Sequence, residues 1–129
     1  MKKTISFIIV TIILLSVVIA EQIYIDKTLD DLILKIDTLN TQTALVENIN
    51  TEEINKTAED LDDFWTKNED ILCVLVNHND LTKIGEEIKK IKLYIKDNNK
   101  EDFVYELDTL KFYATTYKDV FQLNIQNLL

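Results

Sequence analysis

The sequence predicts an all-α protein, in which an N-terminal transmembrane helix continues into an antiparallel bundle of three to four helices. Proline is absent and the only glycine is Gly85. Strand-rich folds need turn residues at short intervals, whereas helices can be joined by Asn and Asp turns. After residue 25, apolar residues recur in steps of three and four, which is the period of helices packed on helices. The length of 129 residues, 47% of them hydrophobic, suits one domain with its own core.

The first expected element is an uncharged stretch, Thr4–Ala20, which follows Lys2 and Lys3. As a helix it spans about 25 Å, close to the short limit for a bilayer whose hydrocarbon core is about 30 Å thick. Ile23–Ile25 extend the apolar character, and Tyr24 within them suits the membrane interface. We therefore expect residues 4–25 to insert into a membrane.

The position of the lysines sets the expected orientation, because cytoplasmic flanks of membrane helices are rich in positive charge. The expected parts are a cytoplasmic N-terminus at residues 1–3, the anchor at 4–25 and an extracytoplasmic helical bundle at 26–129. The alternative is a signal peptide cleaved after Ala20, since Val18-Ile19-Ala20 has small residues where signal peptidase cuts. The protein would then be secreted. The apolar core is longer than that of most signal peptides, which favours the anchor.

Four amphipathic segments are expected in and beyond the anchor, separated by short polar breaks. They cover residues 23–47, 51–77, 80–96 and 100–128. The first continues the membrane helix without a break, and the second has Thr51 or Asn50 as its N-cap. The third carries its acids early and its lysines late, as a helix dipole favours. Short connections imply antiparallel neighbours, so the expected topology is up-down-up-down. The turn at His78 and the C-terminal Leu128-Leu129 would then lie at the membrane-proximal end.

The charge of the chain excludes one class of partner. The formal net charge is −9, with 23 acidic residues against 14 lysines and no arginine. Such a surface repels nucleic acid and anionic lipid headgroups, and missing arginine removes the side chain best suited to gripping phosphate. We expect no nucleic-acid partner. The acids of the second segment are expected to form a solvated face, partly neutralised by lysines of the third.

No motif for catalysis is recognisable: there is no Ser/Cys–His–acid order, no glycine-rich phosphate loop and no HExxH. We expect no enzymatic activity and no cofactor. His78 is the only histidine and is expected to act in a turn or cap, with pH sensing as the alternative. Metal binding is disfavoured, because Cys73, His78 and Asp80 offer at most three ligands without a recognised spacing.

Aromatic residues at helical spacing have two interpretations. The residues are Phe64, Trp65, Phe103, Phe112, Tyr113, Tyr117 and Phe121. The first interpretation is a packed core, and the second is a ligand pocket between helices.

A family resemblance rests on three short features. They are Trp65 in mid-helix, the opening His78-Asn79-Asp80-Leu81 of the next helix, and the ending Asn124-Ile-Gln-Asn127-Leu-Leu. These features are similar to an uncharacterised bacterial family, domain of unknown function 4363, from the anchor to the C-terminus. Asn124 or Asn127 is the counterpart of the asparagine in the family's Asn-Ile-Leu-type ending. The resemblance implies a small anchored helical protein with no established activity. The candidate interaction or turn residues are His78, Asp80, Trp65 and Asn127.

Two functional hypotheses follow. The first is an accessory or interaction subunit, without catalytic activity, that binds another membrane or envelope protein. The second is a ligand-binding or sensing bundle that uses an interhelical aromatic pocket or His78. The sequence leaves the oligomeric state open.

Overall fold

The computed structural model describes residues 1–76 and 78–128, with the side chains of His78 and of residues 123–128 left undescribed. The helices are α1 (Lys2–Ala44), α2 (Glu52–Leu75), α3 (His78–Lys96) and α4 (Lys100–Leu128). No strand occurs in the described ranges. The structure confirms the all-α class and gives the bundle four helices.

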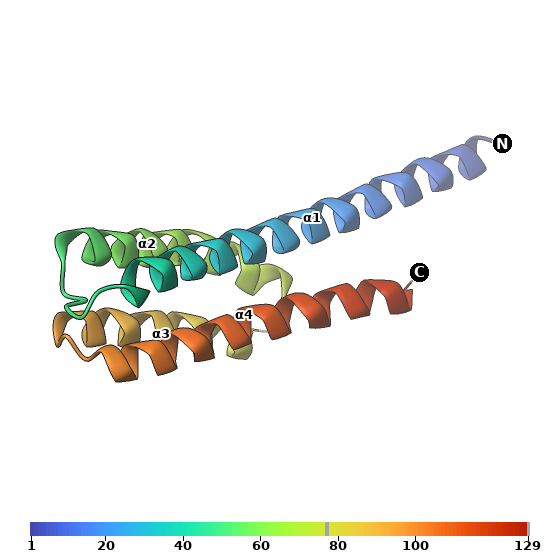
Figure 1. Ribbon diagram of the computed structural model, residues 1–129. Coiled ribbons are helices and arrows are strands. Elements are labelled where there is room, and N and C mark those ends of the chain that lie inside the picture. The colour runs from blue at the N-terminus through green and yellow to red at the C-terminus, as the bar shows by residue number, and fades with distance from the viewer. Residues whose placement is uncertain (77, 129) are drawn as a thin grey trace.

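The four helices form a closed up-down-up-down bundle (Figure 1). α1 packs against α2 and α4, and α3 packs against the same two helices. The α1–α2 and α3–α4 connections lie at one end, which we call the distal end. The α2–α3 connection and both chain termini lie toward the other end, where α1 leaves the bundle. We call this the proximal end, and the arrangement is the one that the short connections predicted.

α1 is one uninterrupted helix of 43 residues, about 65 Å long at 1.5 Å per residue. The expected continuity between the apolar N-terminal segment and the first bundle helix is confirmed. The helix ends at Ala44 rather than at residue 47, because Leu45 already takes the C-cap position. Leu45 is 91% exposed, whereas Ile49, which the sequence placed in a polar break, is completely buried. Ile49 therefore closes the distal end of the core.

Side-chain caps fix the two distal connections. The Thr51 hydroxyl accepts a hydrogen bond from the backbone N–H of Ile54 at 3.2 Å, as expected of an N-cap. Asn98 adopts φ = 51°, the left-handed region that asparagine tolerates better than most residues. Its Oδ1 accepts a hydrogen bond of 2.8 Å from the Ile49 N–H, which joins the two connections.

The core contains the apolar stripes predicted for each helix. Buried residues include Ile25, Leu29, Leu32, Ile36 and Leu39 of α1; Ile54, Ala58, Leu61, Trp65 and Leu72 of α2; Leu81, Ile84, Ile88, Ile91 and Ile95 of α3; and Phe103, Leu107, Leu110 and Ala114 of α4. Tyr117 and Phe121 of α4 pack against this core only partly buried. Leu75 and Val76 at the end of α2 are half-buried too. The packing thus loosens toward the proximal end.

Candidate functional site

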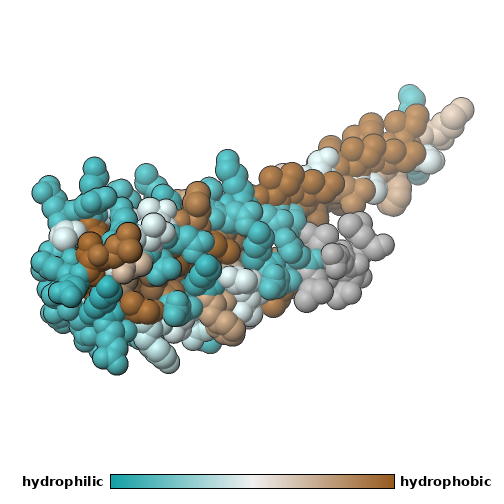
Figure 2. All heavy atoms as spheres, viewed as in Figure 1, coloured by the Kyte–Doolittle hydropathy of each residue, from teal (hydrophilic) through white to brown (hydrophobic). Residues whose placement is uncertain are grey.

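The N-terminal half of α1 projects from the bundle as an arm, which we define as residues 2–24 (Figure 2). Its large apolar side chains between Ile5 and Ile19 are exposed, from 49% at Val17 to 73% at Phe7. None of its most apolar window is buried, and the helix is long and apolar enough to cross a membrane. In water this exposed surface would be unfavourable at roughly 25 cal/mol per Å².

Two hydroxyl groups in the middle of the arm are satisfied by the helix itself. The Thr11 hydroxyl donates to the Phe7 carbonyl at 2.9 Å, and the Ser16 hydroxyl donates to the Ile12 carbonyl at 2.8 Å. A helix in hydrocarbon must satisfy its polar groups internally, because lipid tails offer no partner. The arm meets this condition at Thr11 and Ser16.

A hydrogen-bonded junction ties the arm to the bundle. Tyr24 Oη donates to Asn68 Oδ1 of α2 at 2.6 Å, and Asn68 Nδ2 donates to the Phe64 carbonyl at 2.7 Å. Ile25, the next residue of α1, is the first buried one. The membrane-suited segment therefore passes directly into the packed core without a linker.

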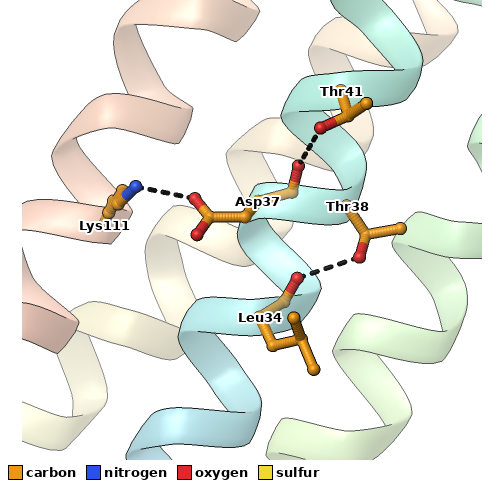
Figure 3. Close-up of polar contacts among 5 residues, drawn as sticks. All are labelled: Leu34, Asp37, Thr38, Thr41 and Lys111. Atoms are coloured by element: carbon orange, nitrogen blue, oxygen red, sulfur yellow. Dashed lines mark hydrogen bonds and ion pairs between the residues drawn. The ribbon is translucent and has the colours of Figure 1, made fainter.

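Two ion pairs join α1 to α4 along one side of the bundle. Lys111 Nζ lies 2.7 Å from Asp37 Oδ1 (Figure 3), and Lys118 pairs with Asp30. The pairs are seven residues apart on both helices, as expected for two antiparallel helices that face each other with one register. The hydrogen bond from Lys118 to Asp30 raises the pKa of that lysine. Both pairs are partly exposed, so each contributes little to stability.

A third lysine crosses from α3 to the acidic face of α2. Lys92 Nζ lies 2.6 Å from Glu59 Oε2 and 2.7 Å from Asp62 Oδ2. Hydrogen bonds to Asp62 and then Glu59 raise the pKa of Lys92. Lys92 of α3 thus neutralises part of the acidic face of α2, as the sequence indicated.

The only glycine of the chain, Gly85 of α3, packs against Trp65 of α2. A Cβ on Gly85 would lie 3.3 Å from Trp65 Nε1 and 3.6 Å from Glu69 Oε1. The indole is 1% exposed, and its N–H has no hydrogen-bond partner among the described residues. A shallow groove of about 300 Å³ runs over this point, lined by Asp62, Trp65, Thr66, Glu69, Thr82, Gly85, Glu86 and Lys89.

The aromatic residues are divided between core and surface. Trp65 and Phe103 are buried in the core. Phe112, Tyr113 and Tyr117 line a groove of about 250 Å³ between α3 and α4, together with Asp80, Lys83, Thr116 and Val120. Phe112 is 65% exposed there. The groove lies on the surface, so the aromatic residues do not enclose an interior cavity at this place.

The candidate residues from the sequence are spread over the bundle. Trp65 lies in the core, and Asp80 lies half-buried in the first turn of α3, with Lys83 Nζ 4.0 Å from its carboxylate. His78 is the first residue of α3, and Asn127 belongs to the last turn of α4. The side chains of His78 and Asn127 lie outside the described residues. His78, Asp80 and Asn127 are thus on elements that meet at the proximal end.

Cys73 and Glu87 are the other reactive or buried groups near these helices. Burial, followed by the charges of Glu69 and Asp70, raises the pKa of the Cys73 thiol, which keeps it in its less nucleophilic form. Glu87 is 7% exposed and its Oε1 lies 3.0 Å from Lys90 Nζ. Within the part of the chain that is described, no three His, Cys, Asp or Glu side chains are grouped to hold a metal ion.

The sequence missed the features that hold the arm to the bundle. The sequence indicated only that Tyr24 suits a membrane interface. No local pattern indicates that its partner is Asn68, 44 residues further along the chain. The closeness of Gly85 to Trp65 was likewise hidden, although a single glycine in mid-helix is a usable signal of close packing.

These features define a class: a four-helix bundle with an exposed apolar helical arm continuous with its first helix. A family model for domain of unknown function 4363 (DUF4363) matches residues 19–128, and the chain belongs to this family. The match begins at the end of the arm and covers the whole bundle. No curated protein and no solved structure matches the chain.

Proposed function

We propose that the protein is a membrane-anchored accessory subunit without catalytic activity, whose extracytoplasmic bundle binds another membrane or envelope protein. The observation that carries the proposal is the arm, whose exposed apolar surface suits lipid and whose helix is continuous with the bundle. A rigid connection of this kind holds a binding surface at a set distance from a bilayer.

The orientation of the proposal follows from Lys2 and Lys3 at the start of the arm. It is tested by introducing Leu45→Cys at the exposed distal end in a Cys73→Ser background. A membrane-impermeant maleimide applied to intact cells is expected to label this cysteine. Labelling only after the cells are lysed would contradict an extracytoplasmic bundle.

The partner hypothesis is tested by purification of the full-length chain from detergent-solubilised membranes after mild crosslinking. A stoichiometric membrane protein is expected to co-purify, and its recovery should depend on exposed bundle positions such as Phe112. Replacing Phe112 with Asp is the test, and replacing the equally exposed Leu34 of α1 with Asp is the matched control. Recovery of the protein alone as a monomer would contradict the proposal.

The second candidate is a ligand-binding or sensing bundle. The supporting observations are the aromatic groove between α3 and α4 and the unpartnered indole N–H of Trp65. A bound ligand stabilises the state that binds it. A small-molecule thermal-shift screen on the detergent-solubilised protein therefore discriminates the two candidates. A stabilising ligand whose effect is lost in Phe112→Ala favours sensing, and the absence of any stabiliser favours the accessory subunit.

A further inference from the structure

The two ends of the bundle differ in charge. At the proximal end, residues 71–79 and residues 120–129 contain no Asp, Glu or Lys. At the distal end, both connections are charged, with Glu47 in the first and the run from Lys96 to Asp102 in the second. Asp80 and Lys83 of α3 line a groove with Val120 at the proximal end, so the uncharged surface there is confined to the ends of α2 and α4. An uncharged apolar surface is unfavourable in water and favourable in the lipid interface.

The uncharged segments extend toward the membrane-suited arm. Asn68 contacts Tyr24, the residue at which the arm joins the bundle, and α2 runs seven residues further to Leu75. Because α2 is antiparallel to α1, this extension carries its end about 10 Å further alongside the arm. α4 likewise runs ten residues beyond Lys118, which pairs with Asp30, and in Figure 1 it ends beyond the α2–α3 connection on the side of the arm.

The end of α2 presents apolar side chains outward. Ile71 is 51% exposed and Val74 is 84% exposed, and Val120 of α4 is 46% exposed. Asp70 and Asp80 flank residues 71–79 in the sequence, and Asp119 directly precedes Val120. Charged residues at such flanking positions suit the level of the lipid headgroups. Apolar side chains of this kind are stabilised in the boundary between headgroups and acyl chains.

We infer that the apolar surface at the proximal end of the bundle, formed by residues 71–76 at the end of α2 and by Val120 of α4, is a second membrane contact that lies in the bilayer interface. The inference rests on the proposed membrane anchoring. The occupant of the surface is lipid, because the arm that enters the bilayer leaves the bundle at this same end. The contact is apolar and contains no lysine between Asp70 and Asp80, so zwitterionic lipid satisfies it without anionic headgroups.

The contact gives the bundle a fixed orientation. With only the arm in the bilayer, the bundle could rotate about the axis of α1 and present any face. With α2 and α4 resting on the membrane as well, the groove between α3 and α4 is held at a constant height above it.

The test places a fluorophore at three single-cysteine positions in a Cys73→Ser background of the full-length chain. Val74→Cys reports on the proposed contact, Leu45→Cys on the distal end and Leu14→Cys on the arm; all three positions are more than half exposed. Each labelled protein is reconstituted in phosphatidylcholine vesicles at a low protein-to-lipid ratio. Emission wavelength is measured, and so is quenching by lipids that carry a nitroxide either near the headgroup or deep in the acyl chain. Quenching by iodide is measured from the water phase.

The expected result is a blue shift and nitroxide quenching at positions 14 and 74, with neither at position 45. Quenching at 14 while 74 behaves like 45 would overturn the second contact and leave the anchor standing. No quenching at 14 would overturn the anchoring and the contact together. Protection of 74 from iodide without nitroxide quenching would overturn the lipid assignment, because a protein surface would then cover the site.

Discussion

The two halves of α1 form one continuous helix but suit two different solvents. In the arm, apolar residues surround the helix on every side, and the large ones from Ile5 to Ile23 remain exposed. In the bundle half, the apolar residues Ile25, Leu29, Leu32, Ile36 and Leu39 follow one stripe, and all of them are buried. The two halves differ in how their apolar residues are distributed around the helix axis. This distribution decides whether a helix packs against protein or against lipid.

The largest expected effect separates buried from exposed leucines within the bundle half. Leu32→Ala removes a completely buried side chain and is expected to lower the free energy of unfolding by about 2–5 kcal/mol. Leu34→Ala changes a residue that is 66% exposed, and it is expected to change the free energy of unfolding by less than about 0.5 kcal/mol. Urea denaturation followed by circular dichroism measures both. Equal effects would contradict the buried stripe.

A charge in the arm is expected to act on membrane insertion and leave the bundle unchanged. Leu14→Asp places a carboxylate in the middle of the arm and is expected to cost about 3 kcal/mol of insertion free energy. The measurement is the fraction of protein that sediments with membranes. Leu34→Asp, with the same chemistry in the bundle half, is the control and is expected to leave that fraction unchanged. A membrane fraction insensitive to both changes would show that the arm does not carry the anchoring.

The junction between the halves is expected to depend on one hydrogen bond. Tyr24→Phe removes the 2.6 Å contact to Asn68 and leaves a half-buried amide oxygen without its donor. The expected loss of unfolding free energy is about 1 kcal/mol. Tyr105→Phe changes a tyrosine that is 70% exposed and should be close to neutral. If the two variants were equally stable, the Tyr24–Asn68 contact would not be what ties the arm to the bundle.

The smallest expected effect is a pH dependence from Lys92. Its pKa in the folded state is raised above the ordinary value of 10.5 by hydrogen bonds to Asp62 and Glu59. A raised folded pKa means that the stabilisation is complete below pH 10.5 and is lost as the pH rises through the folded pKa. Lys92→Met should therefore be destabilised near neutral pH by up to about 1 kcal/mol, and the deficit should shrink in strong alkali.

Lys56→Met serves as the matched control, because it removes one positive charge from an exposed position of α2. Its thermal unfolding near neutral pH is expected to follow that of the unchanged protein. A deficit of Lys92→Met that stayed constant into strong alkali would contradict the role of the ion pairs.

The helices could be predicted because the stripes and the polar breaks are local patterns. The structure confirms the antiparallel bundle, the uninterrupted α1 and the Thr51 cap. The prediction was wrong at the connection between α1 and α2. Ile49 was assigned to a break but is completely buried, because a single apolar residue between asparagines has no period to identify it. Leu45 was assigned to the apolar segment but is exposed, since α1 ends one residue earlier.

The contacts of the candidate site could not be read from sequence in the same way. The Tyr24–Asn68 bond and the approach of Gly85 to Trp65 depend on how two helices are aligned. That alignment is set by the sum of many core contacts, which no single stretch of sequence contains. The ion pair from Lys92 was foreseen only as a general neutralisation of acids, without its particular partners.

The most direct test of the central claim is fractionation of cells that produce the full-length protein, with alkaline carbonate extraction and sequencing of the N-terminus. The arm is expected to keep the protein in the carbonate-resistant membrane pellet with Met1 or Lys2 as its first residue. Recovery of the same full-length chain in the soluble cytosolic fraction would contradict the claim that the arm belongs in lipid.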